Sequence, residues 1–403
     1  MKRVVACVGA IAIGACGVDE IVLRDLSGAS DAGGDGSQIV IDGGARVDAF
    51  GVFGGQGFSC ALVQGAGFCW GNNVQGALGT GDRQSALVPA PIASVATFDQ
   101  LALGEAHSCG LEHTTGRVFC WGYNAYGQLG LGDLVTRTSP QLVALSGPAV
   151  SVTVGYDHSC ATLRDGALYC WGSNGEGQLG VGDAVGSPDA LVPKRVGTAN
   201  DWTLVAGGQG HTCGVRRPGA VYCWGRNTDG ELGVGGGMPV QLHSPARAGT
   251  FDDFVTIDLG QAQSCGVRAD GTLYCWGDRG NGNLTGSGPL LDVPTAIGSD
   301  TDWASVSTDE FTTCAIKRSG ALYCWGRNVE GQLGLGDTND RTTPTLTGDG
   351  RLWASVGVGR FHVCAQTIDH AVSCTGADES GQLGQNDIQR RNRFSAVTLP
   401  GFH

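Results

Sequence analysis

Pairs of cysteines recur along the chain at short, nearly constant spacing. The 403 residues include 16 cysteines, and 14 of these form seven pairs whose members stand about ten positions apart. The pairs are Cys60 with Cys69, Cys109 with Cys120, Cys160 with Cys170, Cys213 with Cys223, Cys265 with Cys275, Cys314 with Cys324, and Cys364 with Cys374. Each pair brackets a tight turn, such as Arg164-Asp165-Gly166, so the two thiols should face each other across adjacent antiparallel strands. Cα atoms at such positions lie about 4.5 Å apart, which a disulfide accepts, and we predict one disulfide for each pair.

Zinc binding is the alternative chemistry for paired cysteines. Structural zinc sites use two cysteines separated by two to four residues and bring four ligands together. That spacing does not occur in this sequence. We therefore favour disulfides, each of which closes a short loop and contributes about 2–3 kcal/mol in the chain-entropy model.

Histidines and aspartates also recur in register with the cysteines. Four repeats have a histidine two residues before the first cysteine of the pair. These histidines could form a metal-binding ring, but Phe58, Gln263 and Thr312 replace them in the other three repeats, so a symmetric metal site is not possible. We therefore expect each histidine to form a local hydrogen bond in its turn. These histidines are His107, His158, His211 and His362. Aspartates that close Gly-x-Gly-Asp or related turns should cap those turns, with calcium binding as the alternative. They are Asp82, Asp133, Asp183, Asp337 and Asp387.

Tryptophan is the third recurring residue type. One follows the second cysteine in six repeats, at positions 70, 121, 171, 224, 276 and 325. Such a ring could stack on sugars, but a period matched to the repeat favours indoles packed between neighbouring units, and the same holds for Trp202, Trp303 and Trp353. The sequence has no nucleophile elbow, zinc-protease motif or phosphate loop, so we predict no catalytic residue, no metal site and no cofactor.

The first residues have the pattern of an export signal. Lys2 and Arg3 precede an apolar run from Val4 to Ile13, and Ile13-Gly14-Ala15-Cys16 resembles a bacterial lipobox, in which the cysteine is lipidated. We expect residues 1–16 to be a lipoprotein signal peptide ending at Cys16, with an ordinary signal peptide cut nearby as the alternative. The protein would then be exported and lipid-anchored to the bacterial cell envelope, at the outer membrane or cell surface, in an oxidising compartment that favours disulfides.

Composition restricts the class of partner. The chain has 70 glycines, 16% charged residues and a formal net charge of −13. The glycine content indicates many turns and few long helices. Because a nucleic-acid binder is expected to carry a basic stripe, we predict no nucleic-acid partner.

A repeat of about fifty residues positions all of these side chains. Cys-Trp-Gly occurs six times, and Cys374-Thr375-Gly376 is a seventh, altered copy. Residues 151–193 illustrate the unit, which contains four short strands separated by glycine-rich turns. Four strands per repeat are typical of a propeller blade. We predict an all-β, seven-bladed β-propeller over residues 46–403 after a flexible Gly/Asp-rich linker at 17–45, and we expect the terminal segment Ala396–Leu399 to pair beside the first repeat.

The repeat resembles that of the regulator of chromosome condensation family. The best matches to its Gly-Gln-Leu-Gly-x-Gly-Asp segment are Gly127–Asp133, Gly177–Asp183 and Gly331–Asp337. The resemblance implies seven-bladed propellers. The founding member exchanges guanine nucleotide on a small GTPase through an inserted wedge and binds chromatin with a basic tail, and neither feature is visible here. A secreted bacterial relative inhibits β-lactamases through one rim, and a plant relative senses light through tryptophans.

A binding role follows from these observations. We predict a non-enzymatic, monomeric cell-envelope lipoprotein that binds a protein partner on one rim of the propeller and contacts the membrane through its lipid only. The alternative is a lectin-like propeller that binds carbohydrate or a surface polymer. A regulator of nucleotide exchange on a small GTPase is less favoured, because the chain is expected to be exported. The sequence identifies neither the partner nor the rim that binds it.

Overall fold

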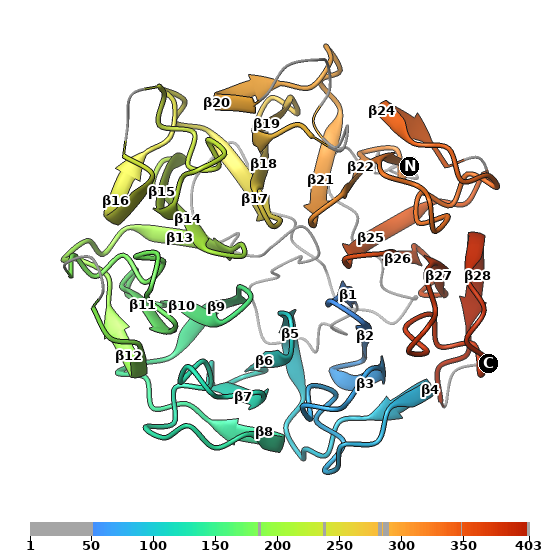
Figure 1. Ribbon diagram of the computed structural model, residues 1–403, viewed down its shortest axis with the longest axis horizontal. Coiled ribbons are helices and arrows are strands. Elements are labelled where there is room, and N and C mark those ends of the chain that lie inside the picture. Colours follow the sequence, from blue (N-terminus) through green and yellow to red (C-terminus); the bar gives the residue numbers. More distant parts are fainter. Residues whose placement is uncertain are drawn as a thin grey trace, which may run out of the picture.

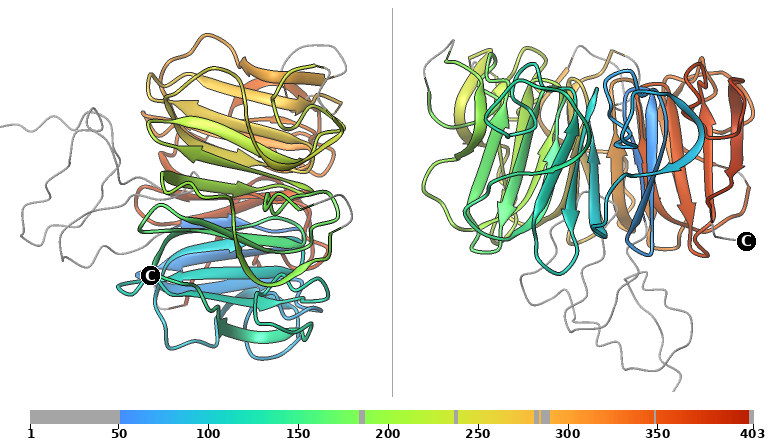
Figure 2. Two further views of the ribbon diagram at one scale, coloured as in Figure 1. Left: turned by 90° about the vertical axis from the view of Figure 1, so that its left-hand side faces the viewer. Right: turned by 90° about the horizontal axis from the view of Figure 1, so that it is seen from below.

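A ring of seven small sheets forms the fold. The computed structural model describes residues 51–183, 187–236, 239–280, 284, 290–347 and 349–400. In this part of the chain, four-stranded antiparallel sheets are arranged around a central axis (Figure 1). Seen from the side, the sheets stand next to one another with their strands running between the two faces of the ring (Figure 2). The predicted seven-bladed β-propeller is therefore confirmed, whereas the predicted signal peptide, Cys16 and the linker at 17–45 lie outside the described residues.

The first four blades take their strands in order from the centre outward. Blade 1 consists of β1 (Gly51–Gly54), β2 (Phe58–Val63), β3 (Ala66–Gly71) and β4 (Ala86–Pro91). Blade 2 consists of β5 (Phe98–Leu103), β6 (His107–Glu112), β7 (Val118–Gly122) and β8 (Arg137–Leu142). Blade 3 consists of β9 (Ala149–Val154), β10 (His158–Leu163), β11 (Leu168–Gly172) and β12 (Ala190–Arg195). Blade 4 consists of β13 (Trp202–Gly207), β14 (His211–Arg216), β15 (Ala220–Arg226) and β16 (Gln241–Arg247).

The last three blades repeat this order. Blade 5 consists of β17 (Phe254–Leu259), β18 (Gln263–Arg268), β19 (Leu273–Asp278) and β20 (Leu290–Ala296). Blade 6 consists of β21 (Trp303–Thr308), β22 (Thr312–Lys317), β23 (Leu322–Gly326) and β24 (Arg341–Leu346). Blade 7 consists of β25 (Trp353–Val358), β26 (His362–Thr367), β27 (Val372–Gly376) and β28 (Arg391–Val397).

A disulfide joins the two middle strands of every blade. In blade 3, Cys160 stands directly opposite Cys170 in the β10–β11 ladder, and the turn between them uses Gly166 at a φ of +81°. The same register recurs in all seven blades, with the paired Cα atoms 4.0 to 4.1 Å apart. The predicted pairing is confirmed, and every bridging cysteine is fully buried.

Tryptophans fill the junctions between blades, as predicted. The Nε1 atom of Trp121 in blade 2 donates to the Ala77 carbonyl of blade 1 at 2.8 Å, and Trp171 in blade 3 donates to the Gln128 carbonyl of blade 2 at 2.9 Å. The six indoles of this series are fully buried, and Trp202, Trp303 and Trp353 are at most 3% exposed. Buried indoles cannot stack on a sugar, so these residues hold the ring together. The described residues include no helix that is long and apolar enough to cross a bilayer.

The outermost strands carry a proline at one fixed register in six blades. The residue that precedes the partner of the second cysteine is Pro89, Pro140, Pro193, Pro245, Pro294 and Pro344 in blades 1 to 6. Proline is tolerated at a sheet edge and discourages pairing with another chain. Blade 7 has Phe394 at this register instead.

Phe394 occupies the place of a missing tryptophan. Thr375 stands where the other blades have the indole, and the ring of Phe394 lies against Gly334, where a Cβ would be 2.6 Å away. Gly79 meets the indole of Trp121 in the same way, also at 2.6 Å. The Phe394 ring is 5.0 Å from that of Trp353. Two departures from the repeat therefore compensate each other in blade 7.

The ring closes by side-by-side packing of blades 7 and 1. The prediction that the terminal segment pairs with the first repeat is wrong, because β28 pairs with β27 in its own blade and blade 1 already has four strands of its own. Val397 and Leu399 instead pack in a buried cluster with Trp70 of blade 1. The Trp70 indole also donates to the Gln382 carbonyl at 2.9 Å.

Candidate functional site

Seven loops surround one mouth of the central channel and define what we call the channel-mouth face. They join the innermost strand of each blade to the next strand and comprise residues 55–57, 104–106, 155–157, 208–210, 260–262, 309–311 and 359–361. A cavity of about 100 Å³ lies between the innermost strands, and every blade contributes to its lining. Because the loops are short and start from rigid strands, side chains on them are held in fixed positions.

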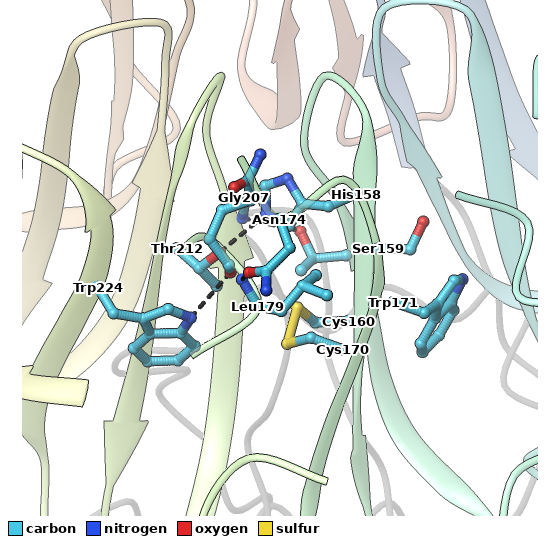
Figure 3. The surroundings of a disulfide bond; sticks show 12 residues. His158, Ser159, Cys160, Cys170, Trp171, Asn174, Leu179, Gly207, Thr212 and Trp224 are labelled. Atoms are coloured by element: carbon cyan, nitrogen blue, oxygen red, sulfur yellow. Dashed lines mark hydrogen bonds between the residues drawn. A yellow bond between two sulfur atoms is a disulfide. The ribbon is translucent and has the colours of Figure 1, made fainter. Parts of the chain in front are cut away.

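The histidines at the end of these loops connect neighbouring blades. The Nε2 atom of His158 in blade 3 lies 2.8 Å from the Thr212 hydroxyl of blade 4 (Figure 3), which itself donates to the Gln178 carbonyl at 2.8 Å. His107, His211 and His362 make the same contact with the serine of the next blade, at 2.9, 3.0 and 2.7 Å. The predicted bond within the turn is therefore wrong in its partner, since each histidine reaches across to a hydroxyl that the repeat alone does not place nearby.

Burial keeps these imidazoles neutral. Desolvation lowers the pKa of His158 and of His362 to about 4, and with the nearby His158 it lowers the pKa of His107 to about 3. Desolvation also lowers the pKa of His211. A pKa below the unfolded value of 6.5 means that the unfolded chain binds more protons between about pH 4 and 6.5. Stability is therefore lost as the pH falls through this range.

The variant His158→Gln should remove this loss at one junction. Gln263 takes the equivalent position in blade 5 and bonds the Thr308 hydroxyl at 2.7 Å, so glutamine fits the site. When the pH is lowered from 8 to 5, the unfolding free energy of the wild type should fall by about 2 kcal/mol more than that of the variant. Urea titrations at both pH values measure this difference, because all other titrating groups are common to the two proteins. If the difference in unfolding free energy between the two proteins were the same at pH 8 and at pH 5, the His158 imidazole of the folded protein would accept a proton freely.

An aromatic patch lies on the channel-mouth face where blades 6 and 7 meet. It consists of Phe311, Phe361, Arg327 and Arg360. The two phenyl rings stack with their centroids 5.7 Å apart and their planes 20° apart. The Arg327 guanidinium lies 4.9 Å from the centroid of Phe311 and 5.4 Å from that of Phe361, and Arg360 lies 5.1 Å from the latter. All four side chains are half-buried.

This patch departs from the sevenfold repeat. The residue directly before the second strand is a phenylalanine in blades 6 and 7 only, and in blades 1 to 5 it is Gly57, Ala106, Asp157, Gly210 and Ala262. The residue after Cys-Trp-Gly at the Arg327 position is Asn72, Tyr123, Ser173, Arg226, Asp278 and Ala377 in the other blades. A stacked aromatic pair between two adjacent blades is not needed to close the ring, because the six other junctions between blades lack it.

Acidic groups border the patch. Glu310 pairs with Arg360 at 2.5 Å, and desolvation raises the pKa of this carboxyl. Asp309 accepts a hydrogen bond from the Glu310 backbone at 2.7 Å and lines the channel cavity. Burial, opposed by that hydrogen bond, raises the pKa of Asp309 to about 7. The patch is therefore a surface of phenyl rings and guanidinium groups with carboxyl groups at its border, and the Arg360–Glu310 ion pair and the ring contacts hold its charged groups in place.

The turn aspartates have a structural role. The Asp133 carboxylate accepts the Val135 backbone N–H at 2.9 Å and pairs with Arg137 at 2.6 Å. Asp337 and Asp387 accept from Asn339 and Gln389 and pair with Arg341 and Arg391 in the same way. Asp82 accepts the Gln84 backbone N–H at 3.0 Å, so the prediction that these aspartates cap turns is confirmed for four of the five. The turn after Asp183 lies outside the described residues, and the Asp183 carboxylate lies 3.4 Å from the Lys194 ammonium. In the described part of the chain, no three His, Cys, Asp or Glu side chains are grouped so as to hold a metal ion.

The comparisons with known families match the same repeat. The model described as "Regulator of chromosome condensation (RCC1) repeat" matches residues 64–111, 115–162, 165–215, 218–267 and 319–366, which together are more than half of the chain. The ultraviolet-B receptor UVR8 of Arabidopsis thaliana is 33% identical over 238 residues, which are 55% of this chain and 51% of that protein. The probable E3 ubiquitin-protein ligase HERC6 of Homo sapiens is 30% identical over 224 residues, 53% of this chain and 22% of that protein. The chain thus spans about half or less of these curated relatives.

Solved structures share the architecture. Human WBSCR16 matches with a TM-score of 0.75 at 20% identity, covering 83% of this chain and 94% of that chain. Prp20p of Saccharomyces cerevisiae matches with a TM-score of 0.72 at 18% identity, covering 86% of this chain and 87% of that chain. At these identities the likeness concerns the fold. With the repeat matched along most of the ring, the chain belongs to the regulator of chromosome condensation (RCC1) repeat family.

Proposed function

We propose that this protein is a non-enzymatic scaffold that binds a protein partner on its channel-mouth face, over blades 6 and 7. The observation that carries the proposal is the aromatic patch, since it departs from the repeat and is not required by the fold. Half-buried phenylalanine and arginine side chains on a rigid surface are the composition of interface hot spots. A protein-binding role is also supported by Prp20p, a propeller of the same fold whose structure was described together with its binding properties to Gsp1p and histones.

The ring would act alone and close to a membrane. We expect a monomer, held at the bacterial cell envelope by acyl chains on Cys16 and separated from the bilayer by the residues up to 45. The export pattern of the first sixteen residues supports this location, and one disulfide in every blade fits an oxidising compartment. Intact-mass measurement of protein purified from envelopes would detect the added acyl mass, and an unmodified Cys16 would contradict the anchor.

Replacing both phenylalanines of the patch should strongly weaken partner binding. Because hot-spot side chains each contribute about 2 kcal/mol or more, Phe311→Ala with Phe361→Ala should weaken the complex by at least about 30-fold. The measurement is quantitative capture of cross-linked partners from envelope extracts by the wild-type and variant rings. Arg164→Ala, an exposed change in the hairpin turn at the opposite end of blade 3, is the matched control. A partner retained equally by all three proteins would place binding elsewhere.

A further inference from the structure

A groove of about 280 Å³ opens at the start of β28, on the outer part of blade 7 beside a loop of blade 6. Arg390, Arg391 and Arg393 line it, together with Asn392, Thr338 and Ser395. These side chains offer guanidinium, amide and hydroxyl donors. Glu330 is the only carboxylate among the lining residues. Three arginines in four residues are unexpected in a chain with a net charge of −13.

The key arginine is foreign to the repeat. Arg393 stands two residues before the partner of the second cysteine, and in the six other blades this register holds an uncharged side chain. Those residues are Val88, Ser139, Val192, Ser244, Val293 and Thr343. The fold therefore does not require a cation at this place, just as it does not require the phenylalanines of the aromatic patch.

The three guanidinium groups differ in how far they are already engaged. Arg391 pairs with Asp387 at 2.6 Å and belongs to the turn below the groove. Arg390 lies 3.2 Å from Glu330, but its side chain is 66% exposed, so this pair is weak. Arg393 packs on the backbone of Gly336, where a Cβ would lie 2.3 Å from its guanidinium, and it forms no ion pair within the described residues. One positioned cation and one loosely held cation thus face the same groove.

We propose that this groove binds a phosphate group, either as the free ion or as a phosphomonoester on a small molecule. Guanidinium groups match the geometry of phosphate oxygens and bind them through paired hydrogen bonds. Asn392, Thr338 and Ser395 add neutral donors for the remaining oxygens. The volume of the groove exceeds that of one phosphate and leaves room for a compact organic group. The acidic charge of the rest of the chain weakens long-range attraction, so binding depends on these local contacts.

Substitutions of Glu330 and of Arg393 should change the phosphate affinity in opposite directions. Its carboxylate competes with phosphate for Arg390, so Glu330→Gln should tighten phosphate binding. Arg393→Gln should weaken it by about tenfold or more, because a charge-assisted contact of about 1.4 kcal/mol or more is lost. Arg83→Gln changes the net charge equally at an exposed position of blade 1 and should leave binding unchanged.

Calorimetric titration of the full mature chain with inorganic phosphate at low ionic strength tests this inference. Saturable binding that is absent with chloride, at least about tenfold weaker with Arg393→Gln and tighter with Glu330→Gln is the expected result. Tighter binding of glycerol phosphate than of inorganic phosphate would identify a phosphomonoester as the ligand, and the reverse would identify the free ion. Equal heats for phosphate and chloride, equal binding of tetraglutamate, or binding unaffected by Arg393→Gln would overturn the proposal. These outcomes are independent of whether the aromatic patch binds a protein.

Discussion

Reduction of the seven disulfides should prevent the ring from folding. Each disulfide closes a loop of about ten residues, which corresponds to about 2–3 kcal/mol of stabilisation in the chain-entropy model, and seven together give about 15–20 kcal/mol. A typical domain has a net stability of only about 5–15 kcal/mol. Because the blades pack only on their neighbours, the contributions of separate blades should be nearly additive.

Refolding in the presence and absence of reductant measures this effect. The bridges are buried, so the chain must be unfolded in denaturant, reduced and then diluted. Native tryptophan fluorescence should return only without reductant, since the indoles are buried in the folded ring. As a graded control, Cys60→Ala with Cys69→Ala removes one bridge and should cost about 2–3 kcal/mol. Recovery of the native spectrum and of the same urea midpoint under reducing conditions would contradict the role assigned to the bridges.

Phe394→Ala should destabilise the propeller by about 3 kcal/mol. This value is at the lower end of the range for replacing a core phenylalanine with alanine, because Phe394 is only half-buried. The ring fills the space beside Gly334 and Trp353 that an indole occupies in the other blades. Thr375→Trp alone should also destabilise the protein, since the indole and the Phe394 ring compete for this space.

The double variant Thr375→Trp with Phe394→Pro restores the residues of the other six blades and should recover most of this stability. Unfolding free energies of the wild type, of Thr375→Trp, of Phe394→Pro and of the double variant form a cycle, from which we expect a coupling of about 2 kcal/mol or more. Additive losses in the double variant would show that Phe394 does not replace the indole. The matched change Val397→Ala reports on ordinary packing in the same strand.

The regular part of the fold could be predicted because the repeat contains it. Cysteines that bracket each turn fix which strands pair and in which register, and the tryptophans mark the packing of one blade on the next. The prediction for the histidines was incomplete for a related reason. Their turn is local in sequence, but the hydroxyl that His158 contacts belongs to the next blade, 54 positions away.

The candidate sites lie where the repeat fails, and this is why the sequence did not reveal them. Phe311 and Phe361 are 50 positions apart in loops of ordinary appearance, and only the closure of blade 7 on blade 6 stacks their rings. A comparison of equivalent loop positions would have identified both as exceptions. The three arginines of the segment Arg390–Arg393 stand out in the sequence, but their groove depends on Glu330 and Thr338 from the neighbouring blade. The role of Phe394 could be recognised only from the position of its phenyl ring in the structure.

The location of the binding surface is tested most directly by hydrogen exchange on the captured complex. With the partner bound, residues 309–312, 325–330 and 359–362 should lose amide exchange relative to the free ring, because they carry the aromatic patch and its supporting loops. Peptides that contain the hairpin turns at the opposite ends of the blades, such as residues 163–167, should exchange as in the free protein. Protection confined to those turns, with the patch unchanged, would contradict the assignment of the channel-mouth face as the binding surface.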